Sequence, residues 1–393
     1  MKYCVIFILI FLDLCFIHGL GITQDTLWTK RYGGSGSEGI NDIEVTDNDH
    51  FILAGFWEGI GAYFLKTNSL GKIIWSSTFV SGISKITPNS LHNNAYMAVG
   101  TNLSDISLVC VGDNGDSLWS RTYGDSLNEY GVDIDATDDK GYILAGNRRV
   151  FYQPDDMDWF IVRIDSIGDT LWTRTYGWSD YDVVRSIEST TDDGYAIAGF
   201  SYLNEEGRGY LVKADSLGSI IWYHLEYDGL DKDYRSVKQT TDGGYVVAGS
   251  TEAWDWFLIE KFYLVKYDSL GNKEWQKEYG EFPYLKVASE VLQTVDGGYM
   301  MIGKAHEWYG NGDNSAFIVR TDSGGEMLWE LILPIDGINS FLRTGAVLSD
   351  NEYIVAGVFD HDMWLLKLRE PSYCCEVDMY PDDDPVVVQP GGS

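Results

Sequence analysis

Three arginines share one position in a recurring sequence pattern. Arg185, Arg235 and Arg343 each lie ten residues before a tyrosine that begins an apolar segment. Guanidinium groups bind carboxylates through paired, charge-assisted hydrogen bonds. If the fold brings the three side chains together, they form a site for a carboxylate-bearing ligand. In the alternative interpretation, each arginine pairs with one of the chain's 60 Asp and Glu residues, and the sequence leaves both open.

Aromatic residues beside acids form a second candidate site. They lie in variable segments at residues 147–158, 200–208, 250–261 and 304–315. Aromatic rings stack on the apolar faces of sugars or peptides, and neighbouring carboxylates accept hydroxyl or amide protons. The same rings can also pack the loops onto the fold. The candidate ligand-binding aromatics are Tyr152, Trp254, Trp256, Trp308 and Tyr309.

Sequence signals for catalysis and metal binding are weak. No G-x-S-x-G motif occurs, and His50, His92, His224, His306 and His361 lie in no nucleophile motif. We therefore expect no catalytic residues, no metal and no cofactor. Calcium is a weaker alternative, because residues 231–233 and 311–314 carry spaced oxygen ligands without completing an EF-hand loop.

These candidates sit within an internal repeat. An aromatic-x-x-x-Gly element and an apolar segment containing one basic residue both recur about every 50 residues, as in YLVKADSLG from Tyr210. A tryptophan recurs with the same spacing. The three markers each occur seven times, with Cys110 in place of the basic residue in the second copy, so the repeat is a structural unit. The repeat tryptophans are Trp28, Trp75, Trp119, Trp172, Trp222, Trp275 and Trp329.

Each repeat predicts four short strands. In one copy they begin at Arg185, Tyr195, Tyr210 and Ile220, and the first turn is Asp193-Gly194, where both residues can take positive φ. No segment has a sustained helical period. Seven such units predict an all-β, seven-bladed β-propeller with four antiparallel strands per blade. The short Asp-Gly and Asp-Ser-x-Gly turns then lie on one face, and the variable segments lie on the other. Arg185, Arg235 and Arg343 are expected at the starts of innermost strands, near the mouth of the channel on the variable face.

The phase of the repeats predicts how the ring closes. The first marker is the fourth-strand segment at residues 25–33, and the last is the third-strand segment from Met363. We therefore expect residues 25–33 to complete the blade formed by residues 340–370. This removes an exposed sheet edge and joins the two ends of the propeller.

The pattern resembles the Trp/Gly-repeat β-propellers of exported bacterial proteins. The resemblance rests on the GY-x-x-AG, LVK-x-DS-x-G and LW-x-x-x-YG segments across about residues 25–370. It extends loosely to quinoprotein-like and delta-sixty-type repeats, and to the Asp-box hairpin of sialidases, which hold a carboxylate with three arginines. It implies an exported propeller of uncharacterised activity, of a kind that often carries a C-terminal sorting module.

The chain ends suggest an exported protein. Residues 1–21 resemble a signal peptide, with Lys2 followed by an apolar run from Val5 to Ile17 that is short for a membrane span. We expect a propeller over residues 22–370, and a linker and the start of a further β domain over residues 371–393. Without the signal, Cys110, Cys374 and Cys375 remain, too few for a disulfide framework. The expected location is secreted, at the cell surface or extracellular, with the periplasm as an alternative.

The net charge limits the kinds of partner that the protein is expected to bind. The net charge of −32 opposes binding to nucleic acid. We therefore expect a monomeric, non-catalytic scaffold that binds glycans or proteins through the variable face. One alternative is a carbohydrate-active hydrolase or lyase that uses acids and the three arginines. Another is a structural or surface-display module.

Overall fold

The computed structural model describes residues 25–370, except residues 35, 60, 80, 93, 150–155, 179–180, 204–205, 255–257, 281–283, 308–313, 334–337 and 350. The predicted signal peptide and the tail after Glu370, with Cys374 and Cys375, lie outside the described residues. Within them the regular structure consists of 28 β-strands, so the all-β prediction is confirmed.

The strands follow one another as antiparallel meanders of four. The N-terminal half contains β1 (Asp25–Tyr32), β2 (Glu38–Val45), β3 (Phe51–Trp57), β4 (Gly61–Thr67), β5 (Ile73–Phe79), β6 (Lys85–Pro88), β7 (Tyr96–Asn102), β8 (Asp105–Val111), β9 (Ser117–Tyr123), β10 (Asn128–Ala136), β11 (Tyr142–Arg149), β12 (Met157–Ile164), β13 (Thr170–Tyr176) and β14 (Tyr181–Ser189). The C-terminal half contains β15 (Tyr195–Leu203), β16 (Glu206–Ala214), β17 (Ile220–Glu226), β18 (Asp231–Gln239), β19 (Tyr245–Trp254), β20 (Leu258–Tyr267), β21 (Lys273–Tyr279), β22 (Tyr284–Gln293), β23 (Tyr299–Glu307), β24 (Asn314–Thr321), β25 (Met327–Leu333), β26 (Ser340–Ser349), β27 (Glu352–Phe359) and β28 (Asp362–Arg369).

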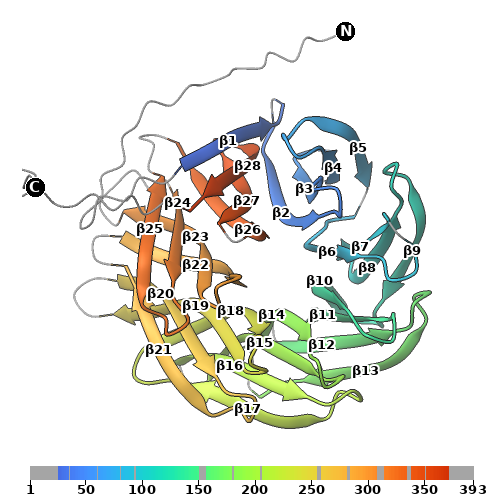
Figure 1. Cartoon of the computed structure of the whole chain (residues 1–393). Coiled ribbons are helices and arrows are strands. Elements are labelled where there is room, and N and C mark those ends of the chain that lie inside the picture. The colour runs from blue at the N-terminus through green and yellow to red at the C-terminus, as the bar shows by residue number, and fades with distance from the viewer. Residues whose placement is uncertain are drawn as a thin grey trace, which may run out of the picture.

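The sheets stand around a central axis (Figure 1). Five of them have four strands, and one parallel pair, Met157 with Tyr181, joins β10–β13 and β14–β17 into a larger sheet. In each meander the first strand lies nearest the axis and the fourth lies at the rim (Figure 1). The innermost strands are β2, β6, β10, β14, β18, β22 and β26.

The N-terminal strand joins the last meander. β1 pairs antiparallel with β28, from Asp25 opposite Arg369 to Tyr32 opposite Met363. The sheet order is therefore β1-β28-β27-β26. This is the pairing that the phase of the repeats predicts, and it gives the last meander its fourth strand.

The turn after β14 differs from the prediction. In the turn that ends at Gly194, only Asp193 has positive φ, at 61°, and Gly194 does not. Backbone hydrogen bonds from Thr190 N to Gly194 O and from Asp193 N to Thr190 O close this turn. Gly243 and Gly297 take the corresponding positive-φ position in later repeats. One left-handed residue is sufficient because the loop is longer than a two-residue hairpin turn.

The repeat tryptophans pack between neighbouring meanders. Trp172 of β13 lies against Tyr195 of β15, with ring centroids 5.9 Å apart, and against Gly218 of the following turn. Gly218 has φ +77°, and a Cβ there would lie 2.9 Å from the indole, so this position needs glycine on both counts. Trp172 is half-buried, whereas the aliphatic residues between the sheets are fully buried.

The repeated basic residues form ion pairs with acids of the short turns. Lys213 is 3% exposed, and its ammonium lies 2.9 Å from Asp192 in the turn of the same meander. Lys266 pairs in the same way with Asp242 at 3.0 Å. Cys110 takes this position in the second repeat and is a buried free thiol. These side chains therefore anchor the short turns of one face.

Candidate functional site: the central channel

Irregular positions in the innermost strands point side chains into the channel. The pairing register of β14, β18 and β26 shifts at Arg185, Arg235 and Arg343, and each shift leaves that residue without a partner on the next strand. Such a β-bulge redirects its extra side chain. Asn41, Val132 and Ser289 lie at the same shift in β2, β10 and β22.

All three predicted arginines line one central cavity. Its volume is about 400 Å³. Sequence reasoning put these arginines at the starts of their strands. They lie inside the strands instead, because β14 begins at Tyr181, β18 at Asp231 and β26 at Ser340. The arginines are therefore part of the channel wall.

Two of the arginines share one carboxylate. Asp233 accepts hydrogen bonds of 3.3 Å from both Nε and Nη2 of Arg185, which comes from the neighbouring meander. The same carboxylate lies 2.7 Å from Nη2 of Arg235 in its own strand. The sequence alternative in which the arginines pair with nearby acids is therefore correct for these two.

The third arginine has a different environment. Arg343 donates a hydrogen bond to the Asn41 side chain, and its guanidinium lies 5.0 Å from the ring centre of Phe341. Among the described residues, no carboxylate lies within 4 Å of its nitrogens. Burial lowers the pKa of Arg343, although the group stays charged at neutral pH.

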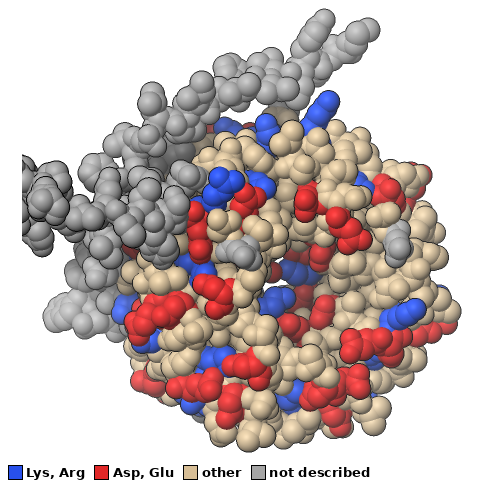
Figure 2. Space-filling model, viewed as in Figure 1, with Lys and Arg blue, Asp and Glu red and all other residues tan. Residues whose placement is uncertain are grey.

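A lysine adds to the positive charge near Arg343. Burial, Arg235 and Arg343 lower the pKa of Lys304 in β23, and Glu260 in β20 opposes them. Within the described part of the chain, no ion pair shorter than 4 Å involves the Lys304 ammonium. Basic and acidic side chains both border the central opening (Figure 2). We call Arg185, Arg235, Arg343 and Lys304 the basic cluster.

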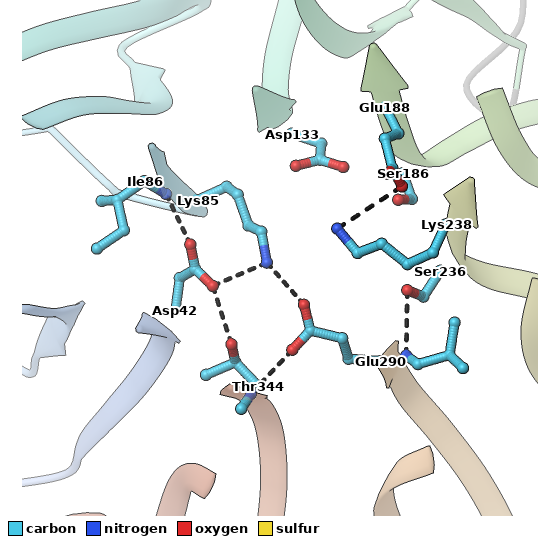
Figure 3. Close-up of polar contacts among 12 residues, drawn as sticks. Asp42, Lys85, Ile86, Asp133, Ser186, Glu188, Ser236, Lys238, Glu290 and Thr344 are labelled. Atoms are coloured by element: carbon cyan, nitrogen blue, oxygen red, sulfur yellow. Dashed lines mark hydrogen bonds and ion pairs between the residues drawn. The ribbon is translucent and has the colours of Figure 1, made fainter. Parts of the chain in front are cut away.

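Next to the bulge residues lies a charged network that sequence reasoning missed (Figure 3). The ammonium of Lys85 bridges Asp42 at 2.8 Å and Glu290 at 3.0 Å. Thr344 Oγ1 donates to Asp42 at 2.9 Å. These residues come from β6, β2, β22 and β26, so the network crosses the channel.

The same layer joins neighbouring innermost strands through backbone amides. Asp42 accepts from Ile86 N at 2.8 Å, and Glu290 accepts from Gly345 N at 2.9 Å. Asp133 accepts from Ile187 N at 2.8 Å. Buried carboxylates are stabilised by such backbone donors. The layer therefore holds the inner ring of strands together.

The next layer contains carboxyls with raised pKa values. Burial, and then the negative charge of Asp42, raise the pKa of Glu44 to about 8. Burial raises the pKa of Glu188 to about 7, although Lys238 lowers it in part. The Glu188 and Lys238 charges lie 3.7 Å apart (Figure 3). These groups titrate near neutral pH, where ordinary carboxyls are fully ionised.

Replacing Glu44 with glutamine is expected to flatten the pH dependence of stability. With its folded pKa above its unfolded pKa, Glu44 binds more protons in the folded state from about pH 4.5 to 8, so stability falls as pH rises through that window. At pH 8, E44Q should raise the free energy of unfolding by on the order of 2 kcal/mol, with little change near pH 4.5. Urea unfolding from pH 4.5 to 8.5 tests this. The exposed Glu326, changed to glutamine, is the control, and an E44Q curve parallel to the parent's would contradict the prediction.

Most of the predicted loop aromatics cannot be placed. Tyr152, Trp256, Trp308 and Tyr309 lie outside the described residues. Trp254 ends β19 opposite Leu258, and its side chain is not described. Their role in ligand binding remains a prediction.

Asp231 and Asp233, two of the possible calcium ligands, have partners within the protein. Asp231 accepts a hydrogen bond from Gly207 N at 2.8 Å, and Asp233 is paired with arginines. Residues 311–313 lie outside the described residues. Across the described ranges, no three His, Cys, Asp or Glu side chains group as a metal site.

The described part of the chain also has no helix of the length and apolar character needed to cross a membrane.

The fold is similar to several solved structures. The WD40 domain of Neurospora crassa Pan2 matches with a TM-score of 0.57 at 9% identity, over 88% of this chain and 95% of that one. The β-propeller domain of Cps50 (Swd1) from Myceliophteria thermophila matches with a TM-score of 0.56 at 10% identity, over 88% and 99%.

The chain is a β-propeller. YCF48 from Cyanidioschyzon merolae also matches, with a TM-score of 0.51 at 12% identity, over 87% of this chain and 98% of that one. No protein-family model matches the sequence, and no curated protein does. At these sequence identities the likeness shows the propeller fold alone and does not identify a ligand.

Proposed function

We propose that this protein is an exported, seven-bladed β-propeller that acts as a non-catalytic binding scaffold. Its ligand is a glycan or protein that presents a carboxylate to the basic cluster of the central channel. The loop aromatics of the variable face would contact the rest of the ligand. The blade number is supported by the four-strand meanders and by the pairing of β1 with β28.

One observation carries the proposal. Arg343 lines the central cavity, and neither Arg343 nor Lys304 has a carboxylate within 4 Å of its side-chain nitrogens among the described residues. This is unusual in a chain of net charge −32, where acids outnumber bases by 60 to 28. A partly buried guanidinium without a carboxylate is a favourable position for a ligand's acid. The cavity of about 400 Å³ provides space for it.

The test compares acidic probes with neutral counterparts by calorimetry. Trigalacturonate and its methyl ester test the glycan source, while a Glu-containing peptide and its Gln counterpart test the protein source. Acidic probes should bind, and R343Q should weaken their binding about tenfold, because one charged hydrogen bond contributes roughly 1.5–3 kcal/mol. Added salt should weaken binding further.

The matched control is Arg174, a β13 residue that stacks on Trp172 at 5.3 Å from its ring centre. R174Q removes the same charge outside the channel and should leave affinity unchanged. Equal binding of acidic and neutral probes, or equal effects of R343Q and R174Q, would argue against the proposal.

The channel acids favour a second candidate function. Glu44 and Glu188 have pKa values near neutrality, as general acids in glycoside hydrolysis require. A carbohydrate-active hydrolase or lyase would use them beside the basic cluster. Turnover of model glycosides or polyuronides that is lost in E188Q would support this function over a binding scaffold.

A further inference from the structure

We infer that Asp233 is a built-in competitor for the ligand's carboxylate. Its side chain occupies the Arg185–Arg235 pair and must leave before a ligand carboxylate can bind there. This inference rests on the proposed function of the basic cluster and describes how that site is regulated.

The repeat itself does not require an acid at this position. Asp233 lies two residues before the bulge arginine of β18. The corresponding residues of the other innermost segments carry no charge, and several are apolar. They are Gly39, Gly82, Tyr130, Val183, Val287 and Phe341. Because these strands form without a carboxylate there, folding does not explain the choice of Asp233.

The geometry of Asp233 matches that of a bound carboxylate. Each of its oxygens accepts a hydrogen bond of 3.3 Å from Arg185, one from Nε and one from Nη2. This is the two-pronged arrangement in which arginine recognises an acid. One of these oxygens also lies 2.7 Å from Arg235. The carboxylate therefore shows which chemical group the two guanidiniums accept.

Asp233 can leave this position at modest cost. Its side chain is 16% exposed, while Arg185 is 36% and Arg235 33% exposed. Water therefore reaches all three groups, and screening by water limits the net stability that these ion pairs contribute. A ligand carboxylate can replace Asp233 with the same hydrogen bonds while Asp233 turns toward solvent.

The site therefore has two positions for an acid. Arg343 forms the open one, because it lines the cavity and no carboxylate of the described residues lies within 4 Å of its nitrogens. Arg185 and Arg235 form the occupied one, where the nearby acid Asp233 lowers the apparent affinity by competition. Removing the Asp233 charge should open the second position.

The experiment measures trigalacturonate and Glu-peptide affinity for the full chain, D233N and E260Q. Asparagine keeps the size of Asp233 and removes its charge. Glu260 contributes negative potential near Arg235 and Lys304 without holding the arginine pair, so E260Q makes the same charge change as a matched control. Thermal melting checks that the variants fold.

D233N is expected to tighten binding at least fivefold for whichever acidic probe the parent binds, and E260Q should change it less than twofold. Adding R235Q to D233N should abolish the gain. Equal gains in D233N and E260Q would overturn the inference, because general electrostatics would explain both. Weaker binding by D233N would also overturn it, since Asp233 would then help the ligand. Acid binding that R343Q weakens but D233N leaves unaltered would overturn this inference alone. Absence of binding by every variant would overturn the proposed function as well.

Discussion

A variant lacking residues 22–33 is expected to lose several kcal/mol of stability and to melt roughly 10 °C or more below the full chain. β1 supplies the outer strand of the last meander through its pairing with β28. Trp28 and Tyr32 pack against a buried cluster that includes Phe51, Leu53 and Met363. Deleting the strand exposes this apolar surface, at about 25 cal/mol per Å², and leaves an unpaired sheet edge.

A circular permutant provides the control for this deletion. Moving residues 25–33 to a position after Glu370 keeps the strand and changes only the connection. The permutant should melt close to the parent, because β1 can still pair with β28. If the deletion variant melts within about two degrees of the parent, β1 does not close the propeller.

The repeat made most of the fold predictable. Phe51, Tyr195 and Tyr245 begin β3, β15 and β19, and the aromatic-x-x-x-Gly pattern places them there. The repeated markers also predicted the pairing of β1 with β28, because the phase of the pattern can be counted from the tryptophans. Strand lengths toward the variable face were less predictable, because those ends do not repeat. The strand expected from Arg185 begins at Tyr181.

The channel was harder to predict because a bulge interrupts the alternation of every innermost strand except β6. In a regular strand, consecutive residues such as Arg235 and Ser236 point to opposite faces. Alternation alone therefore does not predict that both side chains face the channel. Asp42, Lys85 and Glu290 occupy corresponding positions but differ in charge, so comparison of repeats shows no conserved marker there. The three arginines could be predicted because they have the same residue type at the same repeat position. The network could not be predicted because its members have opposite charges at corresponding positions.

This complementarity has an energetic consequence for Lys85. Asp42 is 1% exposed and Glu290 is 9% exposed, and both contact the Lys85 ammonium. Burial raises the pKa of Asp42, whereas the positive charge of Lys85 opposes that shift and, with Lys238, keeps the pKa of Glu290 low. Burial alone would lower the pKa of Lys85, but Asp42 and Glu290 raise it above its ordinary value.

Replacing Lys85 with methionine is therefore expected to cost about 3–5 kcal/mol at pH 7.5, because two buried carboxylates lose their shared cation. At pH 5 the cost should be smaller, because carboxyls whose pKa rises after the loss of Lys85 are then protonated and neutral. Urea unfolding at the two pH values measures this difference.

Lys238 is the matched control: it lies in the same channel but is 36% exposed and 3.7 Å from Glu188, so K238M should cost less. Adding D42N and E290Q to K85M should restore part of the stability, because the remaining side chains carry no unpaired charge. Equal costs for K85M and K238M, or a K85M cost independent of pH, would show that the Lys85 bridge does not hold the innermost strands together.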